Sequence, residues 1–253
     1  MTHRAWFWLG MLAAAAALLV AGNAPGSARA DGSPEHSTVR KSICLESIPF
    51  NGNRGLFRGN PALRRAVSWA LDRTDFVAGS DTETPWTHFL PPGVPGSITN
   101  ARLQPYGTRS NIAKAREIAA GHFRDGRITV YYSSSGTTGP IRAENVRRDL
   151  INLGFDPARI TMRGFAAGQF YVAISRRGSA WDLAVSEGVC EEEPASFVLY
   201  PSWYFPKNQK YLRKIKAARR LSGRARNKAV GKLDLEIARN LAPAAVMAFR
   251  YDR

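Results

Sequence analysis

The chain is poor in the residues from which catalytic and metal sites are most often built. Its 253 residues include four histidines and two cysteines. His36, His88 and His122 lie far apart in the sequence, without the short spacing that zinc ligands show. No Gly-x-Ser-x-Gly motif is present, and the small residues 134–139 lack the Lys-Ser/Thr pair of a phosphate-binding loop. The sequence therefore predicts no metal, no cofactor and no enzymatic activity.

The first thirty residues have the layout of a secretory signal peptide. Arg4 gives a positive start, residues 5–21 form an uncharged apolar run, and Ala28-Arg29-Ala30 is a small-x-small cleavage site. We expect export to the periplasm or the extracellular space, with this segment removed; an uncleaved anchor is the alternative, because the run is near the minimum length for a membrane span. The predicted division is signal peptide 1–30, linker 31–42 and folded domain 43–253.

Positive charge dominates the rest of the chain. Without residues 1–30 the net charge falls from +16 to +14, because Arg4 and Arg29 are the charged side chains removed. The segment Lys207–Lys232 alone holds eleven Lys or Arg residues and no acid. One interpretation is a surface facing an anionic membrane or envelope polymer. The other is the solvent side of two helices, with an inner face formed by Leu212, Ile215, Ala218 and Leu221. No aromatic residues alternate with the cations, so nucleic acid is not an expected partner.

The order of predicted elements indicates an α/β fold. Asn60 and Pro61 are typical of a helix start, and the apolar residues after them follow helical spacing. Ser110 is the predicted cap of a later helix, and Thr74 that of a short one. From residue 110 to 186 helix and strand alternate, which predicts at least partly parallel strands. The expected strands are 43–48, 127–133, 160–163 and 181–186; the longer expected helices are 110–120, 140–153, 169–175, 209–221 and 224–241.

Two features near the strand end at residue 190 suggest roles. Cys44 and Cys190 in an exported chain favour a disulfide, although two buried free thiols are the alternative. Glu191, Glu192 and Glu193 follow directly and reverse the sign of charge in a basic protein. They form either a solvated acidic loop or a site where a carboxylate meets a cationic ligand group, such as the amino terminus of a peptide.

Several stretches, in a consistent order, resemble the solute-binding proteins of dipeptide, oligopeptide and nickel ABC transporters. The stretches are Phe50–Phe57 (FNGNRGLF), Leu63–Arg73 (LRRAVSWALDR), Leu90–Gly96 (LPPGVPG), Trp181–Phe197 and Gly223–Pro243. The resemblance implies one lobe of a periplasmic-binding-protein-like (type II) clamshell, with a mixed sheet flanked by helices. It also favours the disulfide between Cys44 and Cys190, because some members carry cysteines at matching places.

The same resemblance implies binding of a peptide-like solute for an ABC transporter permease. Members of the family are about twice as long and close two lobes on the ligand, whereas the match here covers the C-terminal lobe from Ile43 to Arg250. We therefore expect impaired binding by this lobe alone, unless a separate first lobe or a homodimer completes the cleft. Val189 replaces a tryptophan of the family, which is a departure beside the acidic residues.

Overall fold

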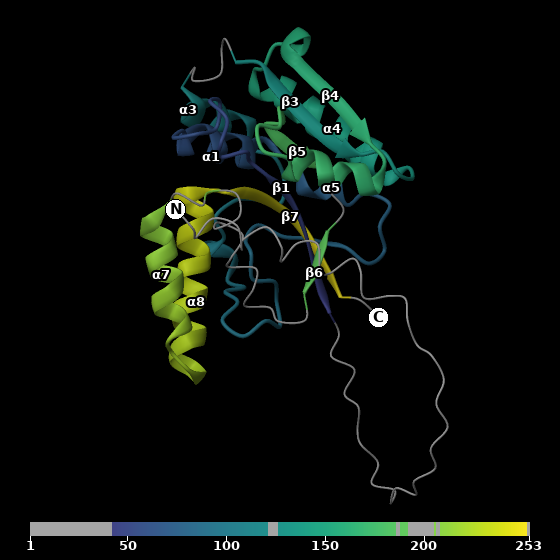
Figure 1. Ribbon diagram of the computed structural model, residues 1–253. Coiled ribbons are helices and arrows are strands. Elements are labelled where there is room, and N and C mark those ends of the chain that lie inside the picture. Colours follow the sequence, from purple (N-terminus) through teal and green to yellow (C-terminus); the bar gives the residue numbers. More distant parts are fainter. Residues whose placement is uncertain (1–41, 121–125, 186–187, 192–204, 206–207, 252–253) are drawn as a thin grey trace, which may run out of the picture. The chain divides into compact units, whose positions relative to one another are not determined.

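A computed structural model describes residues 42–120, 126–185, 188–191, 205 and 208–251, which belong to one unit, Arg40–Arg253. Two sheets organise this unit (Figure 1). One is antiparallel, in the order β2-β7-β1-β6, and consists of β1 (Ile43–Pro49), β2 (Thr84–Pro85), β6 (Val189–Glu191) and β7 (Ala244–Tyr251). The other is parallel, in the order β4-β3-β5, and consists of β3 (Ile128–Ser133), β4 (Ile160–Phe165) and β5 (Leu183–Val185).

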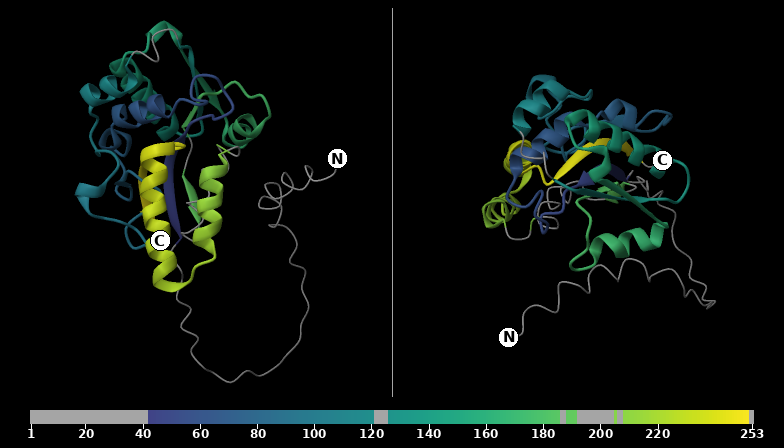
Figure 2. Two further views of the ribbon diagram at one scale, coloured as in Figure 1. Left: turned by 90° about the vertical axis from the view of Figure 1, so that its left-hand side faces the viewer. Right: turned by 90° about the horizontal axis from the view of Figure 1, so that it is seen from above.

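The predicted α/β class is confirmed, and the mixed strand directions are divided between these two sheets. An isolated antiparallel bridge between Phe50 and Leu183 joins them at the end of β1. Figure 2 shows the two sheets and the helices around them from two further sides. Parallel neighbouring strands need long crossover connections, and the helices between β3, β4 and β5 provide them.

Helices cover both faces of the parallel sheet. Successive side chains of β3 point to opposite faces, so Ile128 and Val130 join the main core while Tyr131 joins a smaller cluster. The main core is completed by α1 (Pro61–Ala70), α3 (Ile112–Ala119) and α4 (Thr138–Leu153). On the other face α5 (Ala167–Ser175) buries Phe170 against the smaller cluster. The expected helix 140–153 is thus confirmed, with two more residues at its start.

Local capping agrees with the sequence at one helix and differs at two others. The Asn60 side chain accepts a hydrogen bond from the backbone of Leu63 and caps α1, as predicted. Asn111, and not Ser110, caps α3. Asp72, and not Thr74, caps α2 (Arg73–Phe76). The amide of Asn111 lies one residue after the predicted cap, and the carboxylate of Asp72 lies two residues before it. In each case the side-chain oxygen accepts a hydrogen bond from a backbone N–H in the first turn of the helix.

The fully buried Arg73 fastens α2 to its surroundings. Its guanidinium donates to five carbonyls, those of Ser68, Leu71, Trp86, Gly107 and Val246. Burial lowers the pKa of this group to about 10, which still leaves it charged at neutral pH. A buried cation that donates hydrogen bonds to several backbone oxygens can hold segments from distant parts of the chain in one arrangement.

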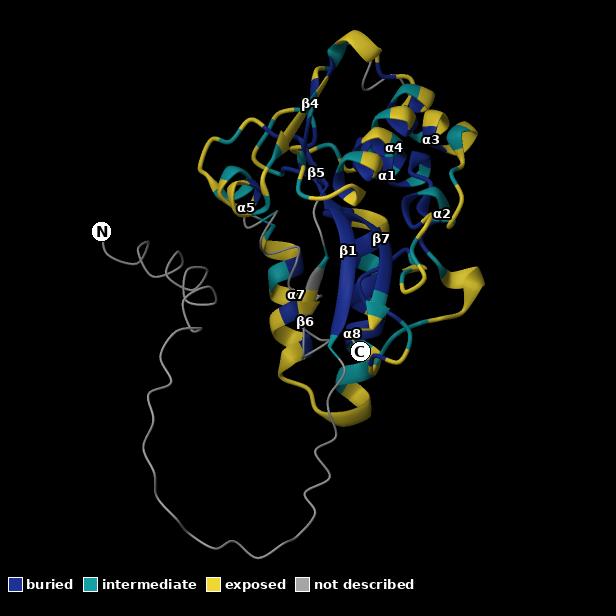
Figure 3. Ribbon diagram, turned by 90° about the vertical axis from the view of Figure 1, so that its right-hand side faces the viewer, coloured by how far each residue is buried: buried dark blue, intermediate teal, exposed yellow. Residues whose placement is uncertain are grey.

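Two helices pack on the antiparallel sheet as a hairpin. They are α7 (Gln209–Arg219) and α8 (Gly223–Glu236), the latter continuing into a π-helical turn, Ile237–Leu241. Their inner side chains join a second core, which includes Tyr211, Ile215 and Ala218. Leu221 does not belong to this inner face, because 43% of it is exposed in the turn between the helices. Figure 3 shows β1 and β7 as buried and much of the outer surface of α7 and α8 as exposed.

The remaining short elements are the 3-10 turns η2 (Ala101–Leu103) and η3 (Pro157–Arg159). Among the helices of the described residues, none combines the length and the apolar character needed to cross a bilayer. The predicted signal peptide and almost all of the predicted linker lie outside the described residues.

Candidate functional site at the disulfide and its charged cluster

The disulfide between Cys44 and Cys190 holds a short edge strand in place. The two residues lie directly opposite each other in the antiparallel pairing of β1 with β6. β6 has three residues, and within the described part of the chain its strand partner is β1. The disulfide thus supplements a short ladder of hydrogen bonds, and it connects positions 146 residues apart.

The predicted ligand-binding residues follow this strand immediately. The backbone of Glu191 pairs with Ile43 at the end of β6. Glu192 and Glu193 lie outside the described residues, as does the side chain of Glu191. Their role as ligand contacts therefore stays a prediction. The structure shows that the acidic segment begins at the end of β6, where Glu191 pairs with Ile43.

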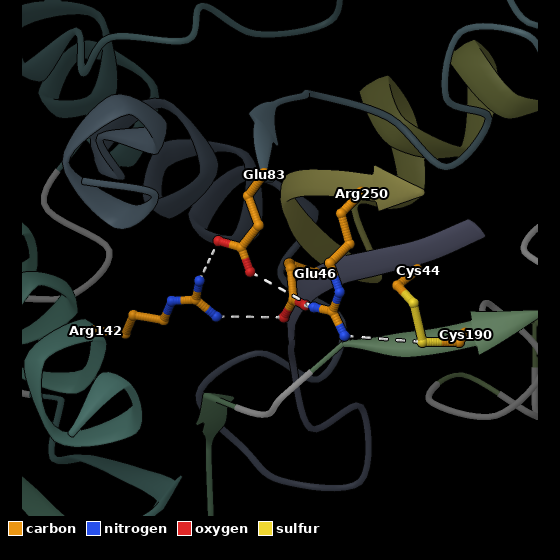
Figure 4. Close-up of a disulfide and its surroundings, with 6 residues drawn as sticks. All are labelled: Cys44, Glu46, Glu83, Arg142, Cys190 and Arg250. Atoms are coloured by element: carbon orange, nitrogen blue, oxygen red, sulfur yellow. Dashed lines mark hydrogen bonds and ion pairs between the residues drawn. A yellow bond between two sulfur atoms is a disulfide. The ribbon is translucent and has the colours of Figure 1, made fainter. Parts of the chain in front are cut away.

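Next to the disulfide lies a largely buried cluster of two carboxylates and two guanidiniums, which we call the charged cluster (Figure 4). Its members are Glu46, Glu83, Arg142 and Arg250. Glu46 on β1 is fully buried, and its Oε1 accepts from Nη1 of Arg250 on β7 at 2.6 Å. Its Oε2 lies 3.5 Å from Nη1 of Arg142 on α4. Arg142 also pairs with Glu83, in the segment before β2.

The electrostatics of the charged cluster are balanced, because the formal charges of its four members cancel. Burial raises the pKa of the Glu46 carboxyl, while the nearby Arg142 acts against this shift. Glu83 adds to the upward shift, and Arg250 also opposes it. The carboxylates pair with guanidiniums that come from different elements, so the cluster positions structural elements. Specifically, it ties β1, β7 and α4 to the segment before β2.

Gly188 brings the charged cluster into contact with β6. A backbone hydrogen bond from Gly188 reaches Glu46. A Cβ atom added at Gly188 would lie 2.2 Å from Oε1 of Glu46, so any larger residue would force the carboxylate to move. At the other end of the cluster, Nη2 of Arg250 lies 3.9 Å from the sulfur of Cys190. The position of β6 is therefore set jointly by the disulfide, the cluster and this glycine.

A backbone irregularity marks the same place. The pairing of β1 with β7 shifts register between Glu46 and Ser47, which leaves Met247 as the extra residue of a β-bulge. The carbonyl of Met247 instead accepts from the backbone of Trp86, beside β2. Bulges re-aim neighbouring side chains, and here the bulge adjoins the residue that links the whole cluster.

Sequence reasoning missed this cluster, although one signal was present. Glu46 is the charged residue of the otherwise uncharged stretch 43–48, which is predicted to be a buried strand. A carboxylate in such a place needs a cationic partner. The partners Arg142 and Arg250 lie 96 and 204 residues away, and their meeting depends on the tertiary fold.

The stretches that carry the family resemblance also meet in space. Asn51 donates through its side-chain amide to the carbonyl of Trp181 at 2.8 Å. Arg54 pairs with Asp182 at 3.0 Å, and Asp182 in turn accepts from the backbone of Thr129. The first and fourth of the resembling stretches thus form one contact region at the junction of the two sheets.

A similar contact joins the third and fifth of these stretches. The buried Asp234 on α8 accepts from the backbone N–H groups of Phe89 and Leu90, at 2.8 and 3.1 Å. Burial raises its pKa to about 7, whereas burial lowers the pKa of the adjacent His88 to about 4. Gly231 permits the close approach, because a Cβ there would lie 2.0 Å from the carbonyl oxygen of Gly96.

His88 takes part in this packing. Its Nε2 lies 3.7 Å from Oδ2 of Asp234, and its side chain is fully buried. Within the described residues, no group of three or more His, Cys, Asp or Glu side chains could hold a metal ion. His36 and His122 lie outside the described residues.

Comparison with known proteins gives a clear result for the fold. No protein-family model matches the chain, and no curated protein matches it in sequence. Among solved structures, it is similar to the ABC transporter substrate-binding protein CtaP from Listeria monocytogenes, with a TM-score of 0.68 and 19% identity over 83% of this chain and 46% of that one.

Two other similar structures were determined with peptides. One is the periplasmic binding protein DppA from Helicobacter pylori in complex with the peptide STSA, with a TM-score of 0.65 and 19% identity over 84% of this chain and 43% of that one. The other is a dipeptide-binding protein from Pseudoalteromonas sp. SM9913 in complex with Met-Leu, with a TM-score of 0.65 and 17% identity over 83% and 43%. The chain therefore has the fold of one part of these binding proteins and spans less than half their length.

Proposed function

We propose that the protein binds a peptide-like solute outside the cytoplasm for an ABC transporter, and that this chain supplies one wall of the binding cleft. The observation that carries the proposal is the fold shared over more than four fifths of the chain with two proteins solved in complex with peptides. The contacts between the resembling stretches support it, because stretches far apart in the sequence meet in one fold. The sequence pattern of residues 1–30 supports export.

The ligand contacts that we propose are the carboxylates of Glu191, Glu192 and Glu193. They would pair with the amino terminus of a peptide, a charge-assisted contact that is stronger than a neutral hydrogen bond. Their support is the position of the segment, which begins at a strand held by the disulfide and the charged cluster. A loop that starts from a fixed strand loses less conformational freedom when a ligand binds.

We further propose that this chain alone binds peptides weakly. Small-ligand sites bury most of the ligand surface, and clamshell proteins do so between two walls. One wall removes only about half of that surface from water. A separately encoded first lobe, or a second copy of this chain, would complete the cleft and present the closed protein to a permease.

The test is a titration of the isotope-labelled full chain with a short peptide, followed by backbone amide NMR. We expect shifts at Gly188–Glu191 and in the residues paired with them, with a dissociation constant weaker than about 100 μM. Acetylation of the peptide amino terminus should reduce the shifts. Saturation at about 1 μM by the monomer would overturn the claim that one lobe is insufficient.

A matched pair of variants locates the contact. The triple variant E191Q/E192Q/E193Q should abolish the shifts. The control D81N/E117Q/E144Q removes three negative charges at exposed positions elsewhere and should leave them intact. Equal losses in both variants would mean that the peptide responds only to overall charge, and shifts confined to other elements would move the site away from β6.

A second function, contact with an anionic surface, is supported by the basic residues of α7 and α8. These helices cover the antiparallel sheet, whereas the acidic segment begins at the edge strand of that sheet. The two functions use different side chains and are compatible.

A further inference from the structure

The hairpin of α7 and α8 presents one sign of charge to solvent. Its inner side chains, among them those of Tyr211, Ile215, Val230 and Leu233, lie in the second core. Its exposed basic residues are Lys210, Arg213, Lys214, Lys216, Arg219, Arg220, Arg224, Lys228 and Lys232. The structure thus places nearly all of the basic segment predicted from sequence on the outside of a firmly packed element.

Little of this charge is neutralised locally. Lys214 pairs with Glu236, with Nζ 2.5 Å from Oε1. No acidic residue occurs between positions 207 and 232. Within the described residues, Arg219, Arg220 and Arg224 form no ion pair. A dense set of like charges without counter-charges is an electrostatic cost, which an anionic partner relieves.

The end of the hairpin combines charge with an exposed apolar side chain. α7 ends at Arg219, and the turn that follows exposes Leu221 by 43%. Arg220 and Arg224 flank this leucine in sequence. The turn lies at the end of the hairpin that points away from the parallel sheet, as the views of Figures 1 and 2 agree. A flat partner can therefore reach the turn without first meeting that sheet.

The chemistry of the surface selects among anionic partners. A second copy of the chain would oppose its own positive charge. Single-stranded nucleic acid needs exposed aromatic rings for stacking, and the aromatic residue of the two helices, Tyr211, is buried. A bilayer with anionic headgroups matches cations spread over two helices, and it also accepts an apolar side chain at its interface.

We propose that the hairpin of α7 and α8 docks on an anionic phospholipid surface, with the turn at Leu221 entering the headgroup region. This inference names the partner for the second function above and does not depend on peptide binding. Each basic side chain near an anionic membrane contributes about 1 kcal/mol, or about fivefold in the partition coefficient. Several such residues together give useful, salt-sensitive binding.

The test is cosedimentation of the full chain with vesicles of equal parts phosphatidylglycerol and phosphatidylcholine at low salt. The variant R219E/R220E/R224E should lower the partition coefficient by at least about a hundredfold, by the increments just given. About 1 M salt should abolish the contribution of these residues, because screening then acts within about 3 Å. The apolar run 5–21 is common to all variants, so differences between them report on the hairpin.

The control variant R127E/R176E/R177E makes the same change of charge at exposed loop positions outside the hairpin. It should retain most of the binding, and an equal loss in both variants would overturn the proposal. The milder set R219Q/R220Q/R224Q, with folding checked by circular dichroism, serves if charge reversal unfolds the protein.

Leu221→Ser separates a membrane from other polyanions. It should reduce vesicle binding severalfold while leaving binding to heparin or to DNA unchanged. If Leu221→Ser weakened binding to vesicles, heparin and DNA equally, the result would favour a soluble polyanion and would contradict the lipid assignment. Peptide titration of the charge-reversal variant should still shift Gly188–Glu191, so failure of either proposal is distinguishable from failure of the other.

Discussion

The charged cluster and the hairpin of α7 and α8 both depend on charged side chains, but the cluster buries them and the hairpin exposes them. In the cluster, Glu46, Glu83 and Arg142 are withdrawn from water, Arg250 is partly exposed, and the four charges balance. In the hairpin, nine basic residues are exposed, and Lys214 pairs with a carboxylate. Charge that is buried and paired fixes geometry, because removing one partner leaves the other unsatisfied. Charge that is exposed and of one sign acts at a distance and contributes little to the fold.

The largest expected effect tests the buried side of this comparison. Glu46→Ala leaves Arg142 and Arg250 without their shared carboxylate, so we expect a loss of about 3–5 kcal/mol in the free energy of unfolding. Urea titration measures it. Glu144→Ala is the control, because its pair with Arg147 is largely exposed and should cost less than about 1 kcal/mol. Similar costs for the two variants would contradict a structural role for the cluster.

A smaller effect is expected at the glycine that contacts the cluster. Gly188→Ala places a methyl group against the Glu46 carboxylate, and we expect a loss of about 1–3 kcal/mol from the forced shift. Gly168→Ala is the matched change in α5, where nothing lies within 4 Å of an added Cβ. It should stabilise the protein by about 0.5–1 kcal/mol, because alanine favours helix more than glycine does. The opposite order of the two thermal midpoints would refute this description of the contact.

The third prediction concerns pH and the buried carboxyl of α8. Burial raises the pKa of Asp234 from 3.8 to about 7, so the folded state holds a proton that the unfolded state releases between these values. The stabilising contribution is therefore complete below about pH 4 and is lost as the pH rises through 7. His88 acts oppositely, because its pKa is lowered from 6.5 to about 4. The free energy of unfolding of the wild type therefore changes less steeply with pH than it would if Asp234 alone titrated.

Denaturation of the wild type and of Asp234→Asn across pH 4 to 8 checks this assignment. The difference in unfolding free energy, wild type minus variant, should decline as the pH rises. Asp81→Asn, at an exposed position, controls for the loss of one negative charge. A difference that is constant with pH would show that Asp234 does not titrate in this range.

The smallest expected effect belongs to the hairpin. R219Q/R220Q/R224Q should change the free energy of unfolding by less than about 0.5 kcal/mol, because these side chains make no ion pair in the described part of the chain. Differential scanning calorimetry gives the value. A loss comparable to that of Glu46→Ala would end the contrast between the two regions and would indicate that the hairpin charges are structural.

Much of the fold was predictable because local chemistry determines it. Asn60, Pro61 and the spacing of the apolar residues after them are sufficient to place α1. The alternation of helices and strands from residue 110 to 186 anticipated the parallel sheet. The errors are also local: Asn111 competes with Ser110 as a cap, and the two differ by one residue.

The candidate site was predictable only in part. The cysteines and the acidic triplet are visible as residue types, and the structure contains the disulfide. The partners of Glu46 depend on a bulge in β7 and on the place of α4, which no nearby residues specify. Leu221 likewise fits a helical pattern, but the helix ends before it, so its exposure follows from a chain reversal.

The position of β1 within its sheet has a consequence for how the protein is made. β1 is the first strand of the described unit to be synthesised, yet both of its neighbours, β6 and β7, come from the last third of the chain. By contrast, β3, β4 and β5 lie within 58 residues of one another in the sequence. β1, with seven buried residues, has no strand partner until β6 and β7 have been synthesised. Until β6 and β7 have been synthesised, the nascent chain therefore exposes an apolar segment, which is a natural target for chaperones.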